Sequence, residues 1–351
     1  MRIVTHNGKI HGDEVASVAL LTAYFTYQGE EVFVFRSRDE TQYLETDILV
    51  DVGLVYDHDN LKYDHHQSNF NQRWSLEDTI PLSSAGLIWR HYGCEIIEMY
   101  LNESSDTNIE SQNSFTEETI TDLQNIIYHR LIQEIDANDN GIDFKTSELN
   151  LSDLVSTLNG DVANDVTQNE NFNRAVGLIG NIFDIKFGEI INSYFNLQTD
   201  LDKMRRMDLS GPSLLVEENI PTIFQCLTEL DPEEKVKFCI FESNREFTIK
   251  TRGKDGNKFR PICPILPQVV LQHSCPPDEL IFVHQNGFLA KSKTLDTAKL
   301  IVQLSLEELT SVESFEEETI NLEILKDKRI WSLAAIGSIG ILGIVYWKFI
   351  D

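Results

Sequence analysis

An apolar segment that ends on an acid constrains the fold of this chain more than any other feature. Ile48, Leu49 and Val50 directly precede Asp51. Three consecutive apolar residues suit a strand that is buried on both faces, as in a parallel sheet. A carboxylate at the end of such a strand is unfavourable to bury unless it is paired or binds a metal ion. The segment therefore predicts an α/β protein with a functional group at the carboxyl end of a strand, and Asp51 is the strongest single candidate.

A histidine-rich segment follows this strand. Residues 57–67 contain three histidines and three aspartates. Imidazole and carboxylate together suit manganese or another divalent metal, whereas soft-metal sites prefer thiolates. Because side chains alternate along an extended segment, His65 and His66 cannot point the same way. One of them is therefore free to bind a metal ion while the other faces the cleft. A polar surface loop is the alternative interpretation.

Two more histidines and an acid lie between the first expected strand, 2–5, and the first expected helix. His6, His11 and Asp13 occupy the region beyond the carboxyl end of a strand, where α/β sheets bind their ligands. Asp13 alone suits a helix cap. The three together predict part of a metal site.

Two acids near the end of a later helix are further candidates. Asp136 and Asp139 stand three residues apart, so they share a face if the helix continues through both. The spacing leaves open which of the two faces a site.

Arginine and serine side chains at other element ends are candidates for binding phosphate. Arg36 and Arg38 follow the second expected strand, and guanidinium groups bind phosphate bidentately. A surface ion pair with Asp39 is an equally good interpretation. Ser83 and Ser84 open an expected helix, whose first N–H groups offer an anion site. Ordinary helix capping is the alternative role of these serines.

Length and segment composition predict two domains, because 351 residues exceed one ordinary domain. Residues 1–205 form the expected metal-binding domain, and 206–304 form a smaller α/β domain. We expect a polar, serine-rich insertion at about 102–118 to be disordered. The second domain contains a hairpin at 252–260 with a basic tip, where a phosphate contact competes with simple solvation.

The formal net charge of −28 argues against a broad basic face for nucleic acid. It leaves open a cleft in which bound cations reverse the local sign. The five cysteines form no C-x-x-C pair, which indicates a reducing compartment.

The C-terminal segment 330–347 carries no charge. As a helix it would be about 27 Å long, close to the ~30 Å hydrocarbon core of a bilayer. Trp331 and Trp347 stand at its ends, where aromatic belts form. We therefore expect an acidic linker at 305–328 and a transmembrane tail anchor at 330–349, with the catalytic part in the cytosol. A buried helix is the alternative.

Several of these segments together resemble the melanocyte-proliferating-gene family, which is related to the DHH phosphoesterases. The resemblance covers roughly residues 1–304. It rests on the following segments, in the order of the family: 5–8, 11–14, 36–39, 47–53, 63–67, 82–88, 134–141 and 282–288.

The resemblance implies a two-domain α/β fold, two divalent ions of the Mn²⁺ or Mg²⁺ type, and 3′-to-5′ exonuclease action on RNA. Carried over residue by residue, the metal ligands are His6 or His11, Asp13, Asp51, His65, and Asp136 or Asp139. Asp51, His66 and Arg38 are candidates for catalysis, with His66 on the substrate phosphate. Arg36, Ser83, Ser84 and His284 are candidates for substrate binding.

The expected mechanism is two-metal hydrolysis, in which two cations about 3.5–4 Å apart share Asp51. Two alternatives remain open. One is a hydrolase of small phosphate esters or nucleotides, which the acidic composition favours. The other is an inactive, membrane-tethered scaffold, because segment 289–293 departs from the family's glycine-histidine-arginine pattern. The sequence makes no prediction of the oligomeric state.

Overall fold

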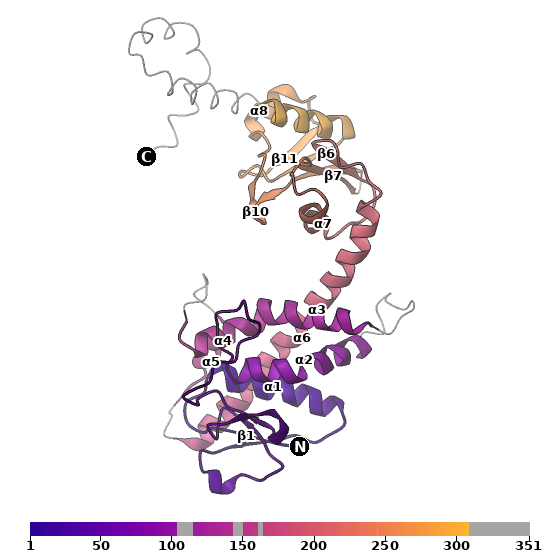
Figure 1. Ribbon diagram of the computed structural model, residues 1–351. Coiled ribbons are helices and arrows are strands. Elements are labelled where there is room, and N and C mark those ends of the chain that lie inside the picture. The colour runs from indigo at the N-terminus through magenta and orange to yellow at the C-terminus, as the bar shows by residue number, and fades with distance from the viewer. Residues whose placement is uncertain (104–114, 143–149, 161–163, 244, 309–351) are drawn as a thin grey trace, which may run out of the picture. The chain divides into compact units, whose positions relative to one another are not determined.

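The computed structural model describes residues 1–103, 115–142, 150–160, 164–243 and 245–308. The chain forms two compact units, Met1–Asn196 and Leu197–Asp351 (Figure 1). The division falls inside one long helix, α6 (Asp165–Met204), which continues to Met204 without a break. The sequence placed the boundary later, at 205/206, where the helix ends.

The first unit is built on a five-stranded sheet of order β2-β1-β3-β5-β4. Four strands are parallel, and β4 pairs antiparallel with β5 at the edge. The apolar strand that precedes Asp51 is central, which explains its three buried residues. The strands are β1 (Arg2–Thr5), β2 (Phe33–Arg36), β3 (Ile48–Val50), β4 (Tyr56–Asp57) and β5 (Lys62–Tyr63).

Helices pack against this sheet and against each other around one hydrophobic core. Helix α1 lies between the sheet and α2 (Figure 1), which explains why its residues Gly12–Leu21 are all buried. The helices are α1 (Gly12–Tyr27), α2 (Ser84–Glu103), α3 (Glu117–Ile127), α4 (Gln133–Asp139), α5 (Leu151–Ser156) and α6. A π-helical turn, Tyr128–Ile132, joins α3 to α4, and 3₁₀ turns occupy Glu40–Gln42 and His58–Asn60.

The second unit contains a five-stranded sheet of order β11-β12-β8-β7-β6, with only β6 and β7 parallel. Its strands are β6 (Ser213–Val216), β7 (Phe238–Ser243), β8 (Glu246–Thr251), β11 (Leu280–Val283) and β12 (Leu289–Ser292); β9 (Gly253–Lys254) and β10 (Asn257–Pro261) form a separate ribbon. Helix α8 (Gln268–Ser274) and a helix at 295–308 cover one face, and α7 (Ile223–Leu230) covers part of the other.

The predicted α/β class with a mainly parallel first sheet is confirmed. The insertion is narrower than predicted, because α2 continues through Glu103 and α3 begins at Glu117; residues 104–114 lie outside the described ones. Residues 305–308 belong to the helix at 295–308, with Ser305 buried, instead of the predicted linker. No helix among the described residues is long and apolar enough to cross a membrane. The predicted linker from 309 and the predicted anchor at 330–349 lie outside the described residues.

Candidate metal centre

The carboxyl ends of three neighbouring strands deliver the central residues of the site. Strands β1, β3 and β5 lie side by side. His6 follows β1, Asp51 follows β3, and His65 and His66 follow β5. Because these strands are parallel, their carboxyl ends meet at one edge of the sheet. The beginning of α1 adds His11, Asp13 and Glu14, and the end of α4 adds Asp139.

Asp51 lies at the middle of this cluster. Its Oδ2 is 3.2 Å from Nε2 of His6, whereas its Oδ1 is 3.5 Å from Nε2 of His65 and 3.2 Å from Nδ1 of His66. The two oxygens of one carboxylate therefore face two different sets of histidines.

Three more acids surround the same histidines. Nε2 of His65 lies 3.0 Å from Oδ2 of Asp139 and 3.9 Å from Oδ2 of Asp13. On the other side, Nε2 of His6 lies 3.4 Å from Oε1 of Glu14. His11 stands next to His6, with 5.1 Å between the ring centroids. The structure thus brings both histidines of the first loop into the site.

The donor atoms fit a divalent metal ion. Five buried atoms of the cluster have no hydrogen-bond partner within the described chain: Nε2 of His6, Oδ1 of Asp13, Oε2 of Glu14, Oδ1 of Asp51 and Nε2 of His65. Buried polar atoms are nearly always paired, so five such atoms at one place need an explanation. Three overlapping groups have donor atoms within 4.8 Å of one another: His6, His11, Glu14 and Asp51; Asp51, His65 and His66; and His11, Asp13 and Asp139. Nitrogen and oxygen donors of this kind suit manganese or magnesium better than soft metals.

The electrostatics of the cluster indicate an excess of buried negative charge. Burial and the neighbouring Asp51 raise the pKa of Asp13 well above its ordinary value, and burial and Asp13 do the same for Glu14. Burial acts against ionisation of Asp51 as well, but the histidines next to its two oxygens hold its pKa below the ordinary value. Burial lowers the pKa of His65, but Asp139 and Asp51 outweigh it and raise that pKa to about 10. In the absence of metal, protons on histidine balance the acids.

The backbone at Asp51 is strained. Its φ is 54°, in the left-handed region, which non-glycine residues rarely adopt. Such a conformation costs about 1–3 kcal/mol and persists only where the surroundings impose it. The N–H group of Asp51 donates to the carbonyl of Tyr63 on β5, over 3.1 Å. That contact helps to turn the carboxylate into the site.

Two acids of the site were missed as candidates by the sequence reasoning. Glu14 accepts a hydrogen bond from the backbone N–H of His11, so it is also the N3 residue of a capping box, and a cap is the usual reason for an acid there. Asp64 accepts from the N–H groups of His66 and Leu54, over 2.9 and 2.7 Å. Its Oδ1 also lies 2.9 Å from Nδ1 of His66, so Asp64 fixes the orientation of that ring.

Arg36, a predicted substrate-binding residue, contacts the first loop. Its guanidinium donates to the carbonyls of His6 and Gly8, both over 3.1 Å, and packs on the ring of Phe172. Asn159, which the sequence did not indicate, holds the same loop by donating to the carbonyl of Ile10 and accepting from its N–H. The loop that carries His6 and His11 is therefore fixed at three carbonyls.

Ser83, Ser84 and Asp136 also serve as supports. Both the N–H and the hydroxyl of Ser83 donate to Oδ1 of Asp136, over 2.9 and 2.7 Å, and Tyr128 donates to Oδ2. Ser84 donates to Oδ2 of Asp13 over 2.6 Å. Both serines are fully buried, and the hydroxyl of each donates a hydrogen bond to a buried acid. Of the two acids that the sequence left open, Asp139 faces the cluster and Asp136 anchors the start of α2.

Two cavities adjoin the cluster. One, of about 260 Å³, is lined by Arg38, Tyr43, Asp51, Asp64 and His66 among others. The second, of about 570 Å³, is lined by Lys9, His11, His65, Asp139 and Asn140 among others. Arg38 is exposed at the first cavity. His284 lies in the second unit, directly after β11.

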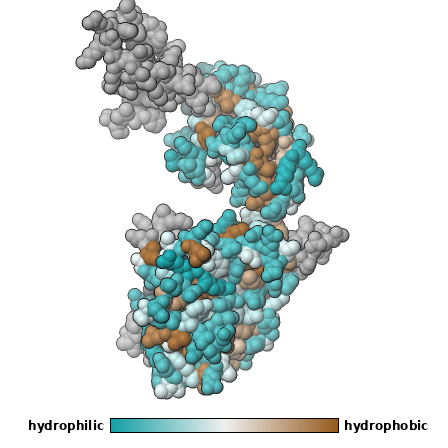
Figure 2. Space-filling model, in the orientation of Figure 1, coloured by the Kyte–Doolittle hydropathy of each residue, from teal (hydrophilic) through white to brown (hydrophobic). Residues whose placement is uncertain are grey.

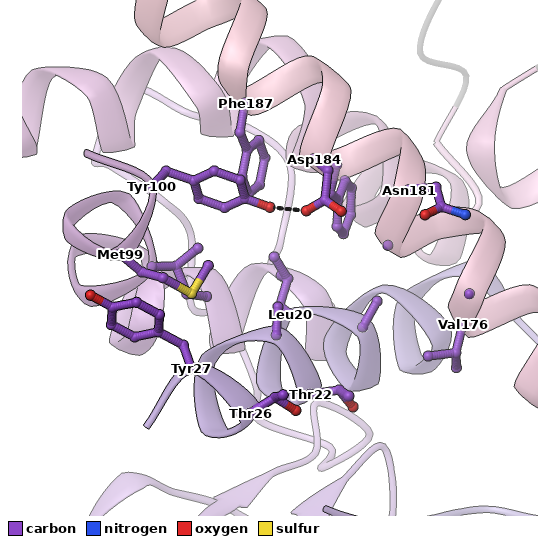
Figure 3. A pocket seen from close by; sticks show the side chains of 16 residues that line it. Leu20, Thr22, Thr26, Tyr27, Met99, Tyr100, Val176, Asn181, Asp184 and Phe187 are labelled. Carbon is purple, nitrogen blue, oxygen red and sulfur yellow. Dashed lines mark hydrogen bonds between the residues drawn. The ribbon is translucent and has the colours of Figure 1, made fainter. Parts of the chain in front are cut away.

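A larger cavity, of about 660 Å³, lies between α1, α2 and α6 (Figure 3). Its lining is mainly apolar, with Leu20, Met99 and Phe187 turned towards it, and the hydroxyl of Tyr100 donates to Asp184 at one side. It shares no residue with the metal-ligand groups among the described residues. Cavity size alone therefore does not mark the functional site of this protein.

A buried carboxylate–imidazole centre at the carboxyl ends of parallel strands, on an α/β fold, defines the class as a metal-dependent hydrolase. The comparison with known families agrees. The model of the MYG1 exonuclease family, described as an uncharacterised protein family (UPF0160), matches residues 2–306. The chain belongs to this family, so the predicted melanocyte-proliferating-gene relationship is confirmed.

Curated relatives match over most of their length. The MYG1 protein of Dictyostelium discoideum is 29% identical over 86% of this chain and 95% of its own. The MYG1 protein of Schizosaccharomyces pombe is 28% identical, over 88% and 98%. The MYG1 exonuclease of Bos taurus is 29% identical, over 87% and 84%. A solved structure of exonuclease RecJ bound to manganese covers 88% of this chain at 12% identity and a TM-score of 0.24, too low to establish a common fold.

Proposed function

We propose that this protein is a metal-dependent nuclease that removes nucleotides from RNA in the 3′-to-5′ direction, with two divalent ions that share Asp51. The observation that carries the proposal is the position of that carboxylate, whose two oxygens face separate sets of histidines. The unpaired buried atoms around it support the same proposal. The names of the bovine and human relatives, both called MYG1 exonuclease, support a nuclease.

In this proposal His6, His11, Glu14 and Asp51 would hold one ion, and Asp13, His65, Asp139 and Asp51 would hold the other. Divalent ions at these places, Mn²⁺ or Mg²⁺, would supply Lewis-acid chemistry and neutralise phosphate charge. They also explain how a chain with a net charge of −28 accepts a polyanion, because bound cations reverse the sign of the site.

The residues of the chain itself position the substrate phosphate. The His66 side chain is 53% exposed, and Asp51 and Asp64 both engage its Nδ1. Its Nε2 is then the atom that faces outward to donate to a phosphate oxygen. Arg38 lies at the same cavity, where its guanidinium would bind the adjacent phosphate.

The test is hydrolysis of 5′-labelled single-stranded RNA with added manganese, compared between the wild type, Asp51→Asn and His65→Ala. A ladder that shortens from the 3′ end in the wild type alone is expected. Equal cleavage by all three proteins would exclude this site, and release of the labelled 5′ nucleotide without a ladder would exclude the proposed direction.

Small nucleotides are the second candidate substrates. The cavity of about 570 Å³ is of the size that holds a single small ligand. Competition separates the two: short nucleotides that inhibit RNA cleavage only weakly favour RNA, whereas faster turnover of the nucleotides favours the small-substrate alternative.

We also propose that residues 330–349 anchor the protein to a membrane. Support comes from the sequence alone, in which residues 330–347 carry no charge. Alkaline extraction of cell membranes tests it: the full chain should stay in the pellet and a chain that ends at 328 should be released. Release of both would contradict the anchor.

A further inference from the structure

The larger cavity beside the metal centre has polar lining residues that metal binding does not explain. The lining of this cavity, of about 570 Å³, includes four residues of the metal centre: His11, His65, His66 and Asp139. The other lining residues come from 9–12, the end of α4 and helix α5, and they are polar apart from Ile10 and Gly12. The visible face of the first unit is likewise mainly hydrophilic (Figure 2). A polar space of this size, next to the metal centre, suits a small polar ligand.

Helix α5 brings a buried hydroxyl group to this cavity. Ser152 is only 8% exposed, and its hydroxyl has no hydrogen-bond partner in the described part of the chain. It packs against Gly12, the residue between His11 and Asp13, where an added Cβ would overlap the Ser152 hydroxyl. Glycine at the beginning of α1 therefore leaves room for this hydroxyl next to the metal centre. Buried polar groups are nearly always paired, so the hydroxyl of Ser152 indicates a partner from outside the chain.

The next residue, Asp153, adds a carboxylate to the same lining. Its backbone is fixed, because its N–H donates to the side chain of Asn150 over 2.8 Å and its carbonyl accepts from the hydroxyl of Ser156. Its carboxylate accepts no hydrogen bond from the described residues and forms no ion pair with them. The other acid of the lining, Asp139, lies 3.0 Å from His65 and is a candidate metal ligand. Asp153 is thus the acid of this cavity that is available to an organic ligand.

Charge and volume decide which part of an RNA strand fits here. Apart from the histidines, the charged residues of the lining are Lys9, which is exposed, and the two acids Asp139 and Asp153. A carboxylate without a paired cation repels phosphate, whereas it accepts hydrogen bonds from sugar hydroxyls. The cavity at Arg38, of about 260 Å³, is smaller than ligand pockets usually are. A nucleoside therefore fits the larger cavity, with its sugar hydroxyls towards Asp153.

We infer that this cavity holds the 3′-terminal nucleoside of the RNA and that Asp153 and Ser152 bind its 2′,3′-diol. The terminal ribose carries two adjacent free hydroxyls, whereas an internal ribose has a free 2′-hydroxyl only. A carboxylate accepts from both hydroxyls, and a serine hydroxyl both donates and accepts. Dinucleotide-binding folds also use an acid to bind ribose hydroxyls. The inference rests on the proposed function and names the strand end that the site selects: a free 3′ end of RNA.

The first test is calorimetric titration of the full chain, loaded with manganese, with nucleoside monophosphates, which contain no phosphodiester to cleave. Adenosine 5′-monophosphate should bind about 10–100-fold more tightly than its 2′-deoxy analogue, the range expected for a hydrogen bond to a charged group. Asp153→Ala should remove most of this preference. Ser152→Ala should lower the affinity for adenosine 5′-monophosphate by about 2–10-fold, because it removes one neutral hydrogen bond.

Asp59→Ala is the matched control for Asp153→Ala and should keep the full preference. Asp59 is exposed on the 3₁₀ turn His58–Asn60 and lines neither cavity. Equal affinity of the wild type for the two nucleotides would overturn the inference. That outcome does not depend on whether Asp153→Ala folds.

Kinetics on RNA ends provide the second measurement. The substrates are 5′-labelled strands that end in ribose, in 2′-deoxyribose or in a 3′-phosphate. The wild type should have its highest kcat/KM on the ribose end, and Asp153→Ala should make the ribose and deoxyribose ends nearly equal. Equal wild-type rates on all three ends would overturn the inference and leave the nuclease function intact. Binding that depends on the diol, in a chain that cleaves no RNA, would reject the proposed function and not this cavity.

Discussion

The first unit buries Asp13, Glu14 and Asp51 at one sheet edge and leaves an oxygen of each without a hydrogen-bond partner. The second unit also buries acids, but it saturates them. Asp231 accepts from the N–H groups of Lys235 and Val236 and pairs with Arg252 over 3.2 Å. The acids of the two units are alike in residue type and in burial. Neither property therefore distinguishes an acid that binds a ligand from one that stabilises a loop.

The difference lies in what the carboxylates contact. An acid whose oxygens accept hydrogen bonds from the chain stabilises the loop that supplies the donors. A buried acid with an unpaired oxygen lowers the stability of the folded chain unless a ligand binds that oxygen. Strain agrees with this division, because Asp51 adopts a positive φ and Asp231 does not. The comparison therefore predicts opposite consequences for substitutions in the two units.

The largest expected effect is on catalysis. Asp51→Asn removes the charge that both histidine sets face, so nuclease activity should fall about 10³-fold or more. The melting temperature of the metal-free protein should fall only modestly, because the lost attraction between Asp51 and the histidines is partly offset by the relief of repulsion on Asp13 and Glu14. Activity assays and thermal melts in EDTA measure both. If Asp51→Asn lost activity only because it unfolded, the expected difference between acids of the first and second units would be contradicted.

In the second unit the effect falls on stability. Asp231→Ala leaves Arg252 buried and unpaired, which should destabilise the protein by about 3–5 kcal/mol. Manganese binding by the folded fraction should be unchanged. Chemical denaturation and metal titration provide the two values, with Asp202→Ala, which is exposed, as the control. A weakened metal affinity in Asp231→Ala would argue against separate roles.

Metal binding should stabilise the protein and should do so increasingly as pH rises. A ligand at a hundred times its Kd contributes about 2.7 kcal/mol. The pKa of His65 is raised to about 10, so at neutral pH this ring must lose a proton before it binds metal. In EDTA the sign reverses: the contribution of His65 and His66, whose pKa values are both raised to about 10, is complete below the unfolded pKa of about 6.5 and is lost as pH rises through about 10.

Thermal melts across the neutral and alkaline range, with manganese and with EDTA, measure these opposite slopes. Asp51→Asn should abolish the rise in melting temperature that manganese causes, although the other acids next to the histidines remain. Parallel slopes in the two conditions would show that the histidines do not bind the metal.

Local patterns predicted the central part of this site well. The apolar run before Asp51 and the histidines at 65–66 are contiguous signals, and the α/β class places ligands beyond the carboxyl ends of the strands. The supports were not predictable in the same way. Asn159 contacts Ile10 across 149 positions, and Arg36 reaches His6 across 30. Nothing in the sequence near these residues indicates such partners.

Helical spacing also could not decide between two equivalent acids. Asp136 and Asp139 lie on one short helix, and the choice depends on how α4 packs against the start of α2. Asp136 lies near the start of α2 and accepts hydrogen bonds from three donors there. Asp139, one turn later on α4, reaches His65 instead.

The smallest effect is expected at Asp136, and it provides the most discriminating comparison. Asp136→Asn keeps an oxygen acceptor for Ser83 and Gly86, so activity and metal affinity should change little, and stability at pH 7 should change by about 1 kcal/mol. Asp139→Asn should lower metal affinity, by roughly 10–100-fold.

The pH dependence of stability gives an independent check on Asp136. Burial raises its pKa to about 7, against the hydrogen bonds from Ser83, so the folded wild type retains a proton that the unfolded chain has lost. Its stability should fall as pH rises from about 4 to about 7, and Asn, which does not titrate, should remove that slope. Denaturation curves of both variants at several pH values measure this. If Asp136→Asn abolished metal binding, Asp136 would be a ligand and the distinction between saturated and unsaturated acids would fail.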